Sequence, residues 1–324
     1  MIITRTPYRV SMFGGGTDHP KWFNENSGSV VSFSIDKYCY ITLRELPPFF
    51  SHKFRVAYSK VETTTSAEQI LHPAVRGAFL KYASGLKLEL HHHGDLPAQS
   101  GVGSSSAFAV GLIKSLYAIN GEDIDSYTLA EEAINFEQKD LSETVGSQDQ
   151  IACAIGGINH IEFNSPNMWK INKINLDSDY IRDIESRIVL IYSGIPRFSS
   201  DISKGLLDRL EMKSQLMNRT KDLANEFNKL LMTKSDLSLV CEMLKESWSI
   251  KKGLNPFSIT PDLESFYQSA LLKGARAGKV LGAGGGGFFL FWVDPENRES
   301  FIEKMTPQVH VPISISFEGS TRIL

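Results

Sequence analysis

The sequence predicts an α+β protein with two lobes, and not a doubly wound parallel sheet in which strands and helices alternate. Strand patterns dominate the start of the chain, where residues 28–46 alternate in part and are rich in β-branched and aromatic residues. Three helical patterns follow one another between residues 200 and 275, and a strand pattern returns at residues 288–293, "FFLFWV". A buried-strand pattern at residues 186–194 separates the two parts. We therefore expect one domain over residues 1–185 and another over 186–324.

Glycine, proline and asparagine divide the chain into its elements. Pro47 ends the first long strand pattern, and the pair Asn120–Gly121 ends a long apolar helix. The expected strands are 28–46, as one strand or two, and 53–59, 86–97, 158–163, 186–194 and 288–293. The expected helices are 67–84 with a break near Pro73, 105–120, 127–141, 200–233, 235–254 and 261–275.

The composition excludes several classes of protein. The 324 residues carry a net charge of −3 and no block of lysine and arginine, which argues against a nucleic-acid partner. The longest apolar run is too short to cross a bilayer, and the first residues contain no apolar signal-peptide core. Cys39, Cys153 and Cys241 are widely spaced and odd in number, which fits neither a disulfide framework nor a zinc site. We expect a cytoplasmic protein without a membrane partner, as a monomer or a homodimer.

Three glycine-rich segments, residues 13–18, 100–107 and 282–287, are candidates for ligand binding. A Walker loop is excluded, because no glycine–lysine pair is followed by serine or threonine. The last segment contains a GxGxxG pattern, but it leads into a strand where a dinucleotide fold would open a helix. That segment is either a tight connection in which small residues let backbones pack closely, or it closely approaches a ligand or another loop.

The middle segment, "LPAQSGVGSSSAF", lies between an expected strand and an expected helix. Free N–H groups and the positive end of the dipole make a helix N-terminus an anion site. Serine hydroxyls there can also bind Mg²⁺. The alternative is a flexible turn followed by N-capping serines.

In order and spacing, the three segments resemble the motifs of the GHMP small-molecule kinases. "PYRVSMFGGGTD" resembles their substrate motif, and "LGAGGGG" resembles their third motif. "PAQSGVGSSSA" resembles their phosphate loop, Pro-x-x-x-Gly-Leu-x-Ser-Ser-Ala, with Val102 for leucine and Ser106 where alanine is usual. The resemblance implies a two-lobed GHMP kinase fold, with an N-terminal mixed α/β lobe like domain 2 of ribosomal protein S5 and a ferredoxin-like α+β C-terminal lobe. It also implies that the ATP phosphates are bound by Pro97, Gly101, Val102, Gly103, Ser104, Ser105, Ser106 and Ala107.

Within this family, "FGGGTDHPKWF" and "GSQDQIACAIGG" are most similar to D-glycero-D-manno-heptose 7-phosphate kinases. Those enzymes phosphorylate the anomeric 1-hydroxyl of a heptose 7-phosphate on the route to GDP-heptose for bacterial surface glycans. Galactokinases carry a Glu-His pair where Gly15 and Gly16 stand here, which argues against galactose. Fucose-type hexose 1-kinases share the glycine-rich form and stay open as an alternative.

The resemblance assigns roles to two carboxylates of "FEQKDLSETVGSQDQ". Asp149 falls at the position of the catalytic aspartate, and its alternative role is the N-cap of the following helix. Glu137 falls at the position of a Mg²⁺-binding glutamate, and Ser105 is its expected partner, since hard cations prefer oxygen ligands. The alternative for Glu137 is a solvated helix face with an ion pair to Lys139 or Lys114.

The remaining site residues surround the expected substrate. Arg9 falls where sugar kinases have an arginine near the reacting hydroxyl, so it would favour the ionised form of Asp149 and stabilise charge in the transition state; its alternative is a surface arginine. Asp18 would accept hydrogen bonds from sugar hydroxyls, or form an Asx-turn. The neighbouring glycines and threonine, and two glycines of the third motif, complete the expected substrate contacts: Gly15, Gly16, Thr17, Gly284 and Gly285.

The substrate's own phosphate requires separate donors. Arg197 and Ser199 precede an expected helix, and an arginine can bind phosphate with two hydrogen bonds. Lys204 is a weaker candidate, and the alternative is a capped helix start with an exposed arginine. The run His91–His93 offers only two histidines on one face of a strand, so we expect no metal site there.

Together these features predict an ATP- and Mg²⁺-dependent kinase for a small-molecule sugar phosphate, acting on C1 of heptose 7-phosphate. A hexose 1-kinase is the first alternative. A non-catalytic nucleotide- or sugar-binding regulator is the second, and the presence of both Glu137 and Asp149 argues against it.

Overall fold

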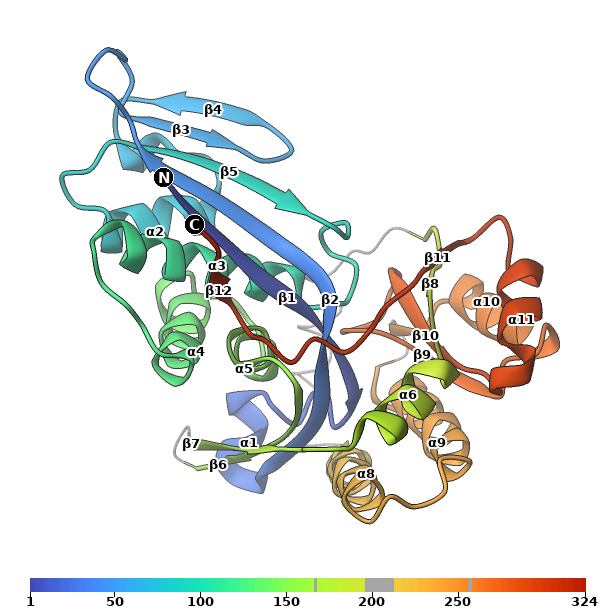
Figure 1. Ribbon diagram of the computed structural model, residues 1–324. Helices are drawn as coiled ribbons and strands as arrows, with labels where there is room; N and C mark the ends of the chain where they lie inside the picture. Colours follow the sequence, from blue (N-terminus) through green and yellow to red (C-terminus); the bar gives the residue numbers. More distant parts are fainter. Residues whose placement is uncertain (166–167, 196–212, 256–257) are drawn as a thin grey trace.

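The computed structural model describes residues 1–165, 168–195, 213–255 and 258–324, which form two sheets with their helices (Figure 1). The first sheet has eight strands, in the order β12-β1-β2-β5-β3-β4, with β6 and β7 attached to β2. The strands are β1 (Ile2–Phe13), β2 (Gly28–Glu45), β3 (Phe54–Ala57), β4 (Val61–Thr64), β5 (Leu88–Gly94), β6 (Ile158–Asn164), β7 (Met168–Lys173) and β12 (Thr321–Arg322). Only β3 and β5 pair in parallel among these strands of the described chain.

Strand β2 organises the first sheet. The sequence left open whether residues 28–46 form one strand or two, and the structure shows one strand of 18 residues. Its first part, Gly28–Phe33, pairs with β6, and its second part, Cys39–Glu45, pairs with β5. Strand β1 runs along the other edge of β2, from the pair Ile2–Leu43 to the pair Phe13–Val31. The turn "GGGTD" after β1 therefore lies at the end of the sheet where β2 begins.

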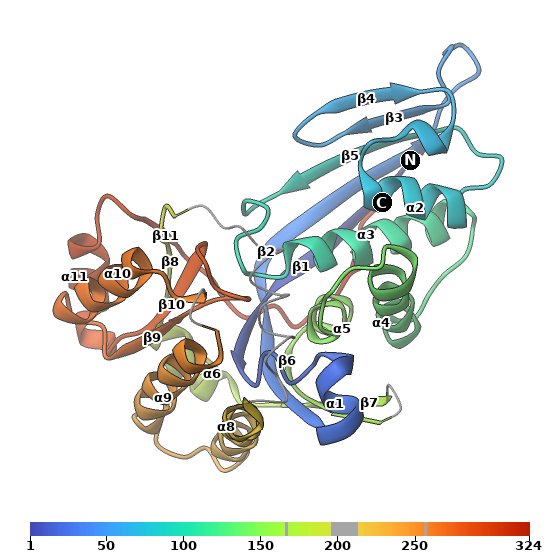
Figure 2. The same cartoon turned by 180° about the vertical axis from the view of Figure 1, so that it is seen from behind.

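Helices cover one face of this sheet, as the view from behind shows (Figure 2). They are α2 (Pro73–Tyr82), α3 (Ser104–Ile119), α4 (Ser126–Asn135) and α5 (Gln148–Ile155), with the short helices α1 (Pro20–Asn26) and η1 (Ala67–Gln69). Helix α3 packs across β1 and β2, so its residues from Ser106 to Leu112 are all buried. Pro73 begins α2 at its first turn, as the predicted break requires. The helix expected over 127–141 is α4 followed by a π-helical turn, η2 (Phe136–Asp140).

The second sheet has four strands in the order β11-β8-β10-β9. The strands are β8 (Ile188–Tyr192), β9 (Ala277–Val280), β10 (Phe288–Trp292) and β11 (Val309–Val311), and all pairs are antiparallel. The accompanying helices are α6 (Ser178–Arg187), α8 (Ser214–Met232), α9 (Leu239–Leu254), α10 (Pro261–Leu272), η5 (Pro295–Asn297) and α11 (Arg298–Lys304). A β-α-β-β-α-β chain with its fourth strand beside the first is a ferredoxin-like lobe, which confirms the predicted α+β class.

The C-terminal segment returns to the first sheet. Ile315 forms a bridge to Ile35 of β2, and β12 pairs with β1, so both ends of the chain lie together in Figure 1. The amide of Ile3 donates to the carbonyl of Leu324 at 3.0 Å. The domain boundary at residue 185, where the chain passes from the first sheet to the second, stays a prediction. The last dozen residues pass back to the first sheet.

A continuous core joins the two sheets. Phe13 at the end of β1 packs against Phe227 of α8 with tilted rings, whose centroids are 5.0 Å apart. Phe289 and Phe291 of β10 centre a smaller cluster with the outer helices of the second lobe. All three cysteines are free and buried.

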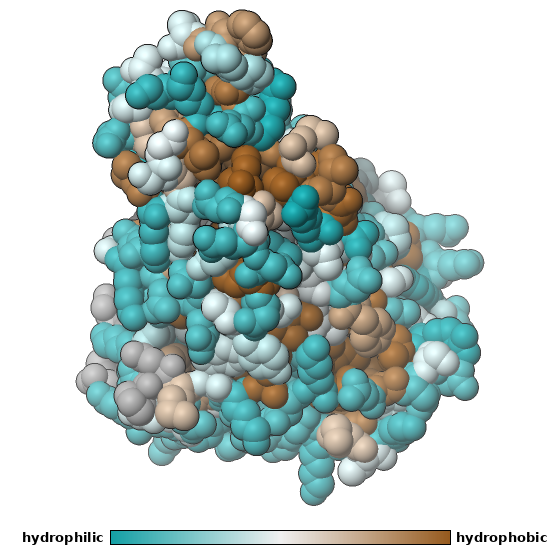
Figure 3. Space-filling model, turned by 60° about the vertical axis from the view of Figure 1, so that its left-hand side comes forward, coloured by the Kyte–Doolittle hydropathy of each residue, from teal (hydrophilic) through white to brown (hydrophobic). Residues whose placement is uncertain are grey.

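The surface carries both hydrophilic and hydrophobic residues. Figure 3 shows a mostly hydrophilic face with a hydrophobic band below the projecting part at the top. In the part of the chain that the structure describes, no helix combines the length and apolar character that a bilayer span requires.

Candidate active site

The centre of the site is an ion pair between the first strand and the first turn of α5. Arg9 Nε donates to Asp149 Oδ1 at 2.7 Å, and Nη2 donates to Oδ2 at 2.5 Å. The third guanidinium nitrogen, Nη1, donates to the carbonyl of Gly101 at 2.8 Å. The arginine therefore joins β1, α5 and the loop before α3, three segments that are far apart in the sequence.

Burial and charge act in opposite directions on this pair. Arg9 is only 4% exposed, so the alternative of a surface arginine is wrong. Burial opposes its charge, but the nearby carboxylate and its hydrogen bonds outweigh burial and raise the pKa of Arg9 above its ordinary value. Asp149 keeps a quarter of its side chain exposed, so it is accessible to a ligand. The N-cap of α5 is Ser147, so the capping alternative for Asp149 is also wrong.

The loop before α3 has the backbone of an anion site. Gly101 and Gly103 have φ angles of +91° and +75°, and Gly103 is the N-cap of α3. A Cβ on Gly103 would lie 3.1 Å from Arg9 Cγ and 3.4 Å from Asp149 Oδ2. The unpaired N–H groups in the first turn of α3 therefore lie near the ion pair, because Gly103 immediately precedes them. Ser104 Oγ accepts from the amide of Gln99 at 3.1 Å, and Ser105 is exposed.

The remaining predicted residues of this loop have internal roles. Pro97 O accepts from Ser100 Oγ at 2.6 Å, and Val102 O accepts from the amide of Arg9 at 3.0 Å. Val102 and Ala107 are fully buried. These contacts fix the loop on β1, while its exposed residues are Pro97, Ala98, Gln99 and Ser105.

The third glycine-rich segment, residues 282–287, packs directly on the loop before α3. The amide of Phe288 donates to the carbonyl of Ser100 at 3.0 Å. A Cβ on Gly101 would lie 2.6 Å from Leu281 O, and a Cβ on Gly287 would lie 2.4 Å from Ser100 O. The alternative of close packing against another loop is therefore confirmed. Only glycine allows the two backbones to approach this closely.

Two glycines of that segment were predicted to contact the substrate, and the structure gives them a packing partner. The amide of Gly285 donates to Ser258 O at 2.8 Å, and a Cβ on Gly284 would lie 2.4 Å from the same oxygen. Their contact with a substrate stays a prediction.

Asp18 is held rigidly next to the ion pair. Its Oδ1 accepts from the amide of Gly16 at 2.8 Å, and its Oδ2 accepts from the amide of Gln148 at 3.2 Å. Gly146 passes so close that a Cβ there would overlap Asp18 Oδ2. The carboxylate thus ties the "GGGTD" turn to the start of α5, and sequence reasoning did not identify Gln148 or Gly146.

Thr17 has a structural role in the same turn. Its hydroxyl donates to Gly14 O at 2.8 Å and accepts from the amide of Ser29 at 3.1 Å, and the residue is fully buried. Gly15 is exposed on this turn, and Gly16 is half-buried.

Glu137 lies in the π-helical turn and points into the protein. It is 1% exposed, so the solvated-face alternative is wrong. Burial raises the pKa of Glu137 to about 8, against the lowering effect of its bond from Ser106. Ser106 Oγ donates to Oε2 at 2.7 Å, and Gln150 donates to the same oxygen. The structure thus bonds Glu137 to Ser106, for which the only signal was the serine where the family usually has alanine. The predicted binding of one Mg²⁺ ion by Glu137 and Ser105 together stays a prediction.

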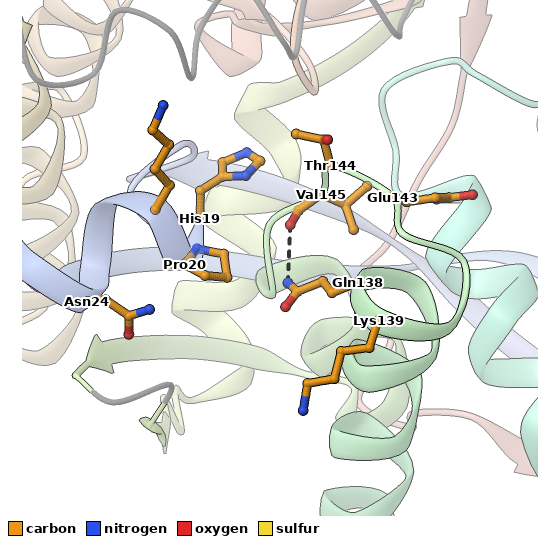
Figure 4. Close-up of a pocket in the computed structure, with 9 residues that line it drawn as sticks. His19, Pro20, Asn24, Gln138, Lys139, Glu143, Thr144 and Val145 are labelled. Atoms are coloured by element: carbon orange, nitrogen blue, oxygen red, sulfur yellow. Dashed lines mark hydrogen bonds between the residues drawn. The ribbon is translucent and has the colours of Figure 1, made fainter.

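A cavity of about 340 Å³ opens beside the turn that carries Asp18 (Figure 4). The start of α1 and the end of the π-helical turn form its walls, and Gln138 donates to Val145 O across it at 3.1 Å. The cavity is lined by His19, Pro20, Lys21, Asn24, Gln138, Lys139, Glu143, Thr144 and Val145. Its lining does not include Arg9 or Asp149.

Two other predictions concern residues away from the Arg9–Asp149 pair: the donors for the substrate's own phosphate and the histidine run. Arg197, Ser199 and Lys204 lie outside the described residues. His91 contacts Glu89 at 2.9 Å, and no group of three or more potential ligands that could hold a metal occurs among the described residues.

The comparison with known families decides the class of the protein. The family described as GHMP kinases N terminal domain matches residues 69–157, and the one described as GHMP kinases C terminal matches residues 227–310. The chain belongs to the GHMP kinases. The first match contains the phosphate loop, Glu137 and Asp149, and the second contains the third glycine motif. ATP is the phosphoryl donor expected throughout this family.

Among GHMP kinases, the chain is similar to sugar kinases along its whole length. It is 29% identical to the D-glycero-alpha-D-manno-heptose 7-phosphate kinase of Campylobacter jejuni, over 94% of this chain and 93% of the relative. It is 22% identical to a bifunctional fucokinase/GDP-fucose pyrophosphorylase of Arabidopsis thaliana, over 95% of this chain but 31% of the relative. Both relatives are thus named as kinases of sugars or sugar phosphates.

Solved structures agree on the fold. A D-glycero-D-manno-heptose 1-phosphate kinase of Bacteroides thetaiotaomicron superimposes with a TM-score of 0.83 at 23% identity, over 100% of this chain and 99% of that one. A putative sugar kinase of Campylobacter jejuni superimposes with a TM-score of 0.78 at 25% identity, over 99% and 97%. The first likeness shows the fold alone, and its name gives a different phosphate position from the curated relative.

Proposed function

We propose that this GHMP kinase transfers a phosphoryl group from ATP to the anomeric C1 hydroxyl of D-glycero-D-manno-heptose 7-phosphate, giving the 1,7-bisphosphate for GDP-heptose and surface-glycan synthesis in the cytoplasm. The carrying observation is the Arg9–Asp149 pair beside the N-terminus of α3. The full-length similarity to a heptose 7-phosphate kinase supports the choice of sugar.

The chain's own groups suit the reaction. Asp149 accepts the proton of the attacking hydroxyl as the new O–P bond forms, and Arg9 orients its carboxylate with two hydrogen bonds. Phosphoryl transfer depends mainly on positioning and on charge neutralisation. The bond to the leaving ADP breaks opposite the attacking oxygen, on the side of the α3 N–H groups. Asp18 accepts hydrogen bonds from the sugar.

Mg²⁺ fits the donors around Glu137. Burial raises the pKa of Glu137 to about 8, and a neighbouring cation would favour the ionised form of this carboxyl. The hydroxyls of Ser106 and Ser105 are also hard oxygen ligands. The bound ion would supply charge neutralisation for the transferred group. Phosphate oxygens and water would have to complete its shell, because the described residues offer few ligands.

The substrate's own phosphate is assigned to Arg197 and Ser199, before the C-terminal helices. An Arg197→Ala variant is expected to weaken binding of the phosphorylated sugar only, and an unchanged KM for that sugar would remove Arg197 from the site.

A fucose-type hexose 1-kinase is the second candidate, because two fucokinase relatives also match over at least 90% of this chain. A panel of sugars with and without a terminal phosphate, scored by ADP release, separates the two. The heptose proposal expects turnover only with the 7-phosphate; equal use of an unphosphorylated sugar contradicts it.

A further inference from the structure

Lys279 is a buried lysine that the proposed reaction does not use. It lies on β9 with 8% of its surface exposed. Its Nζ donates to the carbonyl of Met12 at 2.8 Å, and within the described part of the chain this is the one hydrogen bond of the ammonium group. An ammonium group has three N–H donors, and burying it without a carboxylate is costly. Such a group indicates a source of negative charge that the protein alone does not supply.

The elements packed on β9 bring no acid to this position. Strand β10 is apolar along its whole length. Helix α9 contributes Lys251, whose Nζ donates to the carbonyls of Val280 and Gly282, and α10 contributes Tyr267. The glutamates of these two helices form their ion pairs elsewhere, with Lys245, Arg219 and Lys252. The charges nearest to Lys279 are therefore those of other cations.

Lys279 is linked to the loop before α3 through its own strand. The carbonyl of Leu281, two residues further on, lies 2.6 Å from where a Cβ on Gly101 would be. The carbonyl of Gly101 accepts from Arg9. Burial lowers the pKa of Lys279 to about 8, and the charge of Arg9 contributes to this lowering. Because charges are weakly screened inside a protein, a charge bound in this loop acts on Lys279 as well.

We propose that Lys279 is a positioning residue for the nucleotide: it holds the end of β1 against β9, and the phosphates bound at the loop before α3 supply the negative charge that this ammonium group lacks. Met12 leads into the glycine-rich turn 13–18, so one side chain ties this turn to the segment 282–287. ATP and ADP therefore bind the charged form of Lys279 more tightly than the neutral form. The inference rests on the proposed function only in that a nucleotide binds at this loop.

Proton uptake during nucleotide binding tests the proposal without turnover. If the phosphates raise the pKa of Lys279 by one unit, the protein takes up roughly 0.4 proton per MgADP at pH 8. Calorimetric titration of MgADP without sugar, in two buffers of different ionisation enthalpy, measures this uptake. The Kd for MgADP should also rise about five- to tenfold between pH 7 and pH 9.5, because the charged form binds better.

Lys279→Met removes the charge and the N–H donors. It should lose the proton uptake, and its Kd for MgADP should be raised about five- to tenfold at pH 7 and stay constant to pH 9.5. Lys279→Arg keeps a positive charge at every pH tested, so it should bind MgADP tightly with no pH dependence and no uptake. Any proton that Mg²⁺ displaces from Glu137 is common to all these proteins, so the difference between them isolates Lys279.

Lys245→Met is the matched control, because Lys245 forms only an exposed ion pair with Glu242 on α9. It should keep the proton uptake and the pH dependence of the wild type. A merely structural role of Lys279 would change the melting temperature of Lys279→Met and leave the proton uptake as in the wild type.

The outcomes separate this inference from the proposed function. Equal proton uptake in the wild type and Lys279→Met, or no uptake by a wild type that binds MgADP, would overturn the role of Lys279 alone. A wild type that does not bind MgADP at any pH contradicts both. The sugar that the enzyme prefers has no effect on the result, because no sugar is present.

Discussion

Arg9 holds Asp149 with two parallel hydrogen bonds, from Nε at 2.7 Å and from Nη2 at 2.5 Å, while its third nitrogen binds Gly101 O. One guanidinium thus fixes the orientation of the candidate base relative to the loop that opens α3. Bidentate pairs of this kind add geometric specificity as well as energy.

Asp149→Asn should lower kcat by a factor on the order of 10² to 10⁴, because the amide cannot accept the proton of the sugar hydroxyl. The protein should still fold, as circular dichroism would show. Asp140→Asn is the control, since Asp140 forms only an exposed ion pair with Lys81. Full turnover by a folded Asp149→Asn protein would exclude Asp149 as the base.

Arg9→Lys should lower both kcat and stability, because an ammonium group cannot reproduce the bidentate bond and the bond to Gly101 together. The expected loss in the free energy of unfolding is about 1–3 kcal/mol, and kcat should fall about tenfold or more. Combining Arg9→Lys with Asp149→Asn should cost less than the sum of the single changes, because both remove the same contact. Simple additivity would argue against a functional pair.

Glu137→Gln should raise the Mg²⁺ concentration needed for half-maximal activity by about tenfold or more, because a neutral amide is a poor ligand for a hard cation. Its oxygen can still accept from Ser106, so the fold should persist. Glu132→Gln is the control, since that side chain accepts from the hydroxyl of Tyr82 at 2.7 Å. An unchanged Mg²⁺ requirement would remove Glu137 from the cation site.

Gly101→Ala should disturb the packing between the loop before α3 and the glycine-rich segment 282–287. The methyl group would lie 2.6 Å from Leu281 O, in addition to the strain of φ +91°. Gly157→Ala has a similar strain at φ +81° but meets only Phe317 at 3.9 Å. Gly101→Ala should therefore lower the melting temperature more and raise the KM for ATP, whereas Gly157→Ala should leave the KM for ATP unchanged.

Lys279 of β9 should make stability depend on pH. Burial, with a contribution from the charge of Arg9, lowers the pKa of Lys279 from 10.5 to about 8. Between these values Lys279 binds more protons in the unfolded chain than in the folded protein, so its contribution to the free energy of unfolding, relative to Lys279→Met, should rise with pH by on the order of 3 kcal/mol. Urea unfolding from pH 7.5 to 10.5 measures the rise. It should be absent in Lys279→Met, and identical slopes in both proteins would contradict the assignment.

The sequence predicted the local elements well where a single signal was strong. Pro73 begins α2 and the Asn120–Gly121 pair ends α3, because proline and glycine act through their own backbone preferences. It missed α1, a seven-residue helix whose only signal is Pro20 at its start. It also missed the π-helical turn, since the pattern of 127–141 fits a continuous α-helix.

The sequence by itself determined the family, the order of the motifs and the residues that meet at the ion pair, because each motif is local in the chain. Only the tertiary structure decided which groups touch: Ser106 on Glu137, and Lys279 on the carbonyl of Met12. Adjacent serines at a helix start point in directions about 100° apart, so their partners depend on how α3 packs against the π-helical turn. The bond between Lys279 and Met12 joins residues 267 positions apart, which no local pattern records.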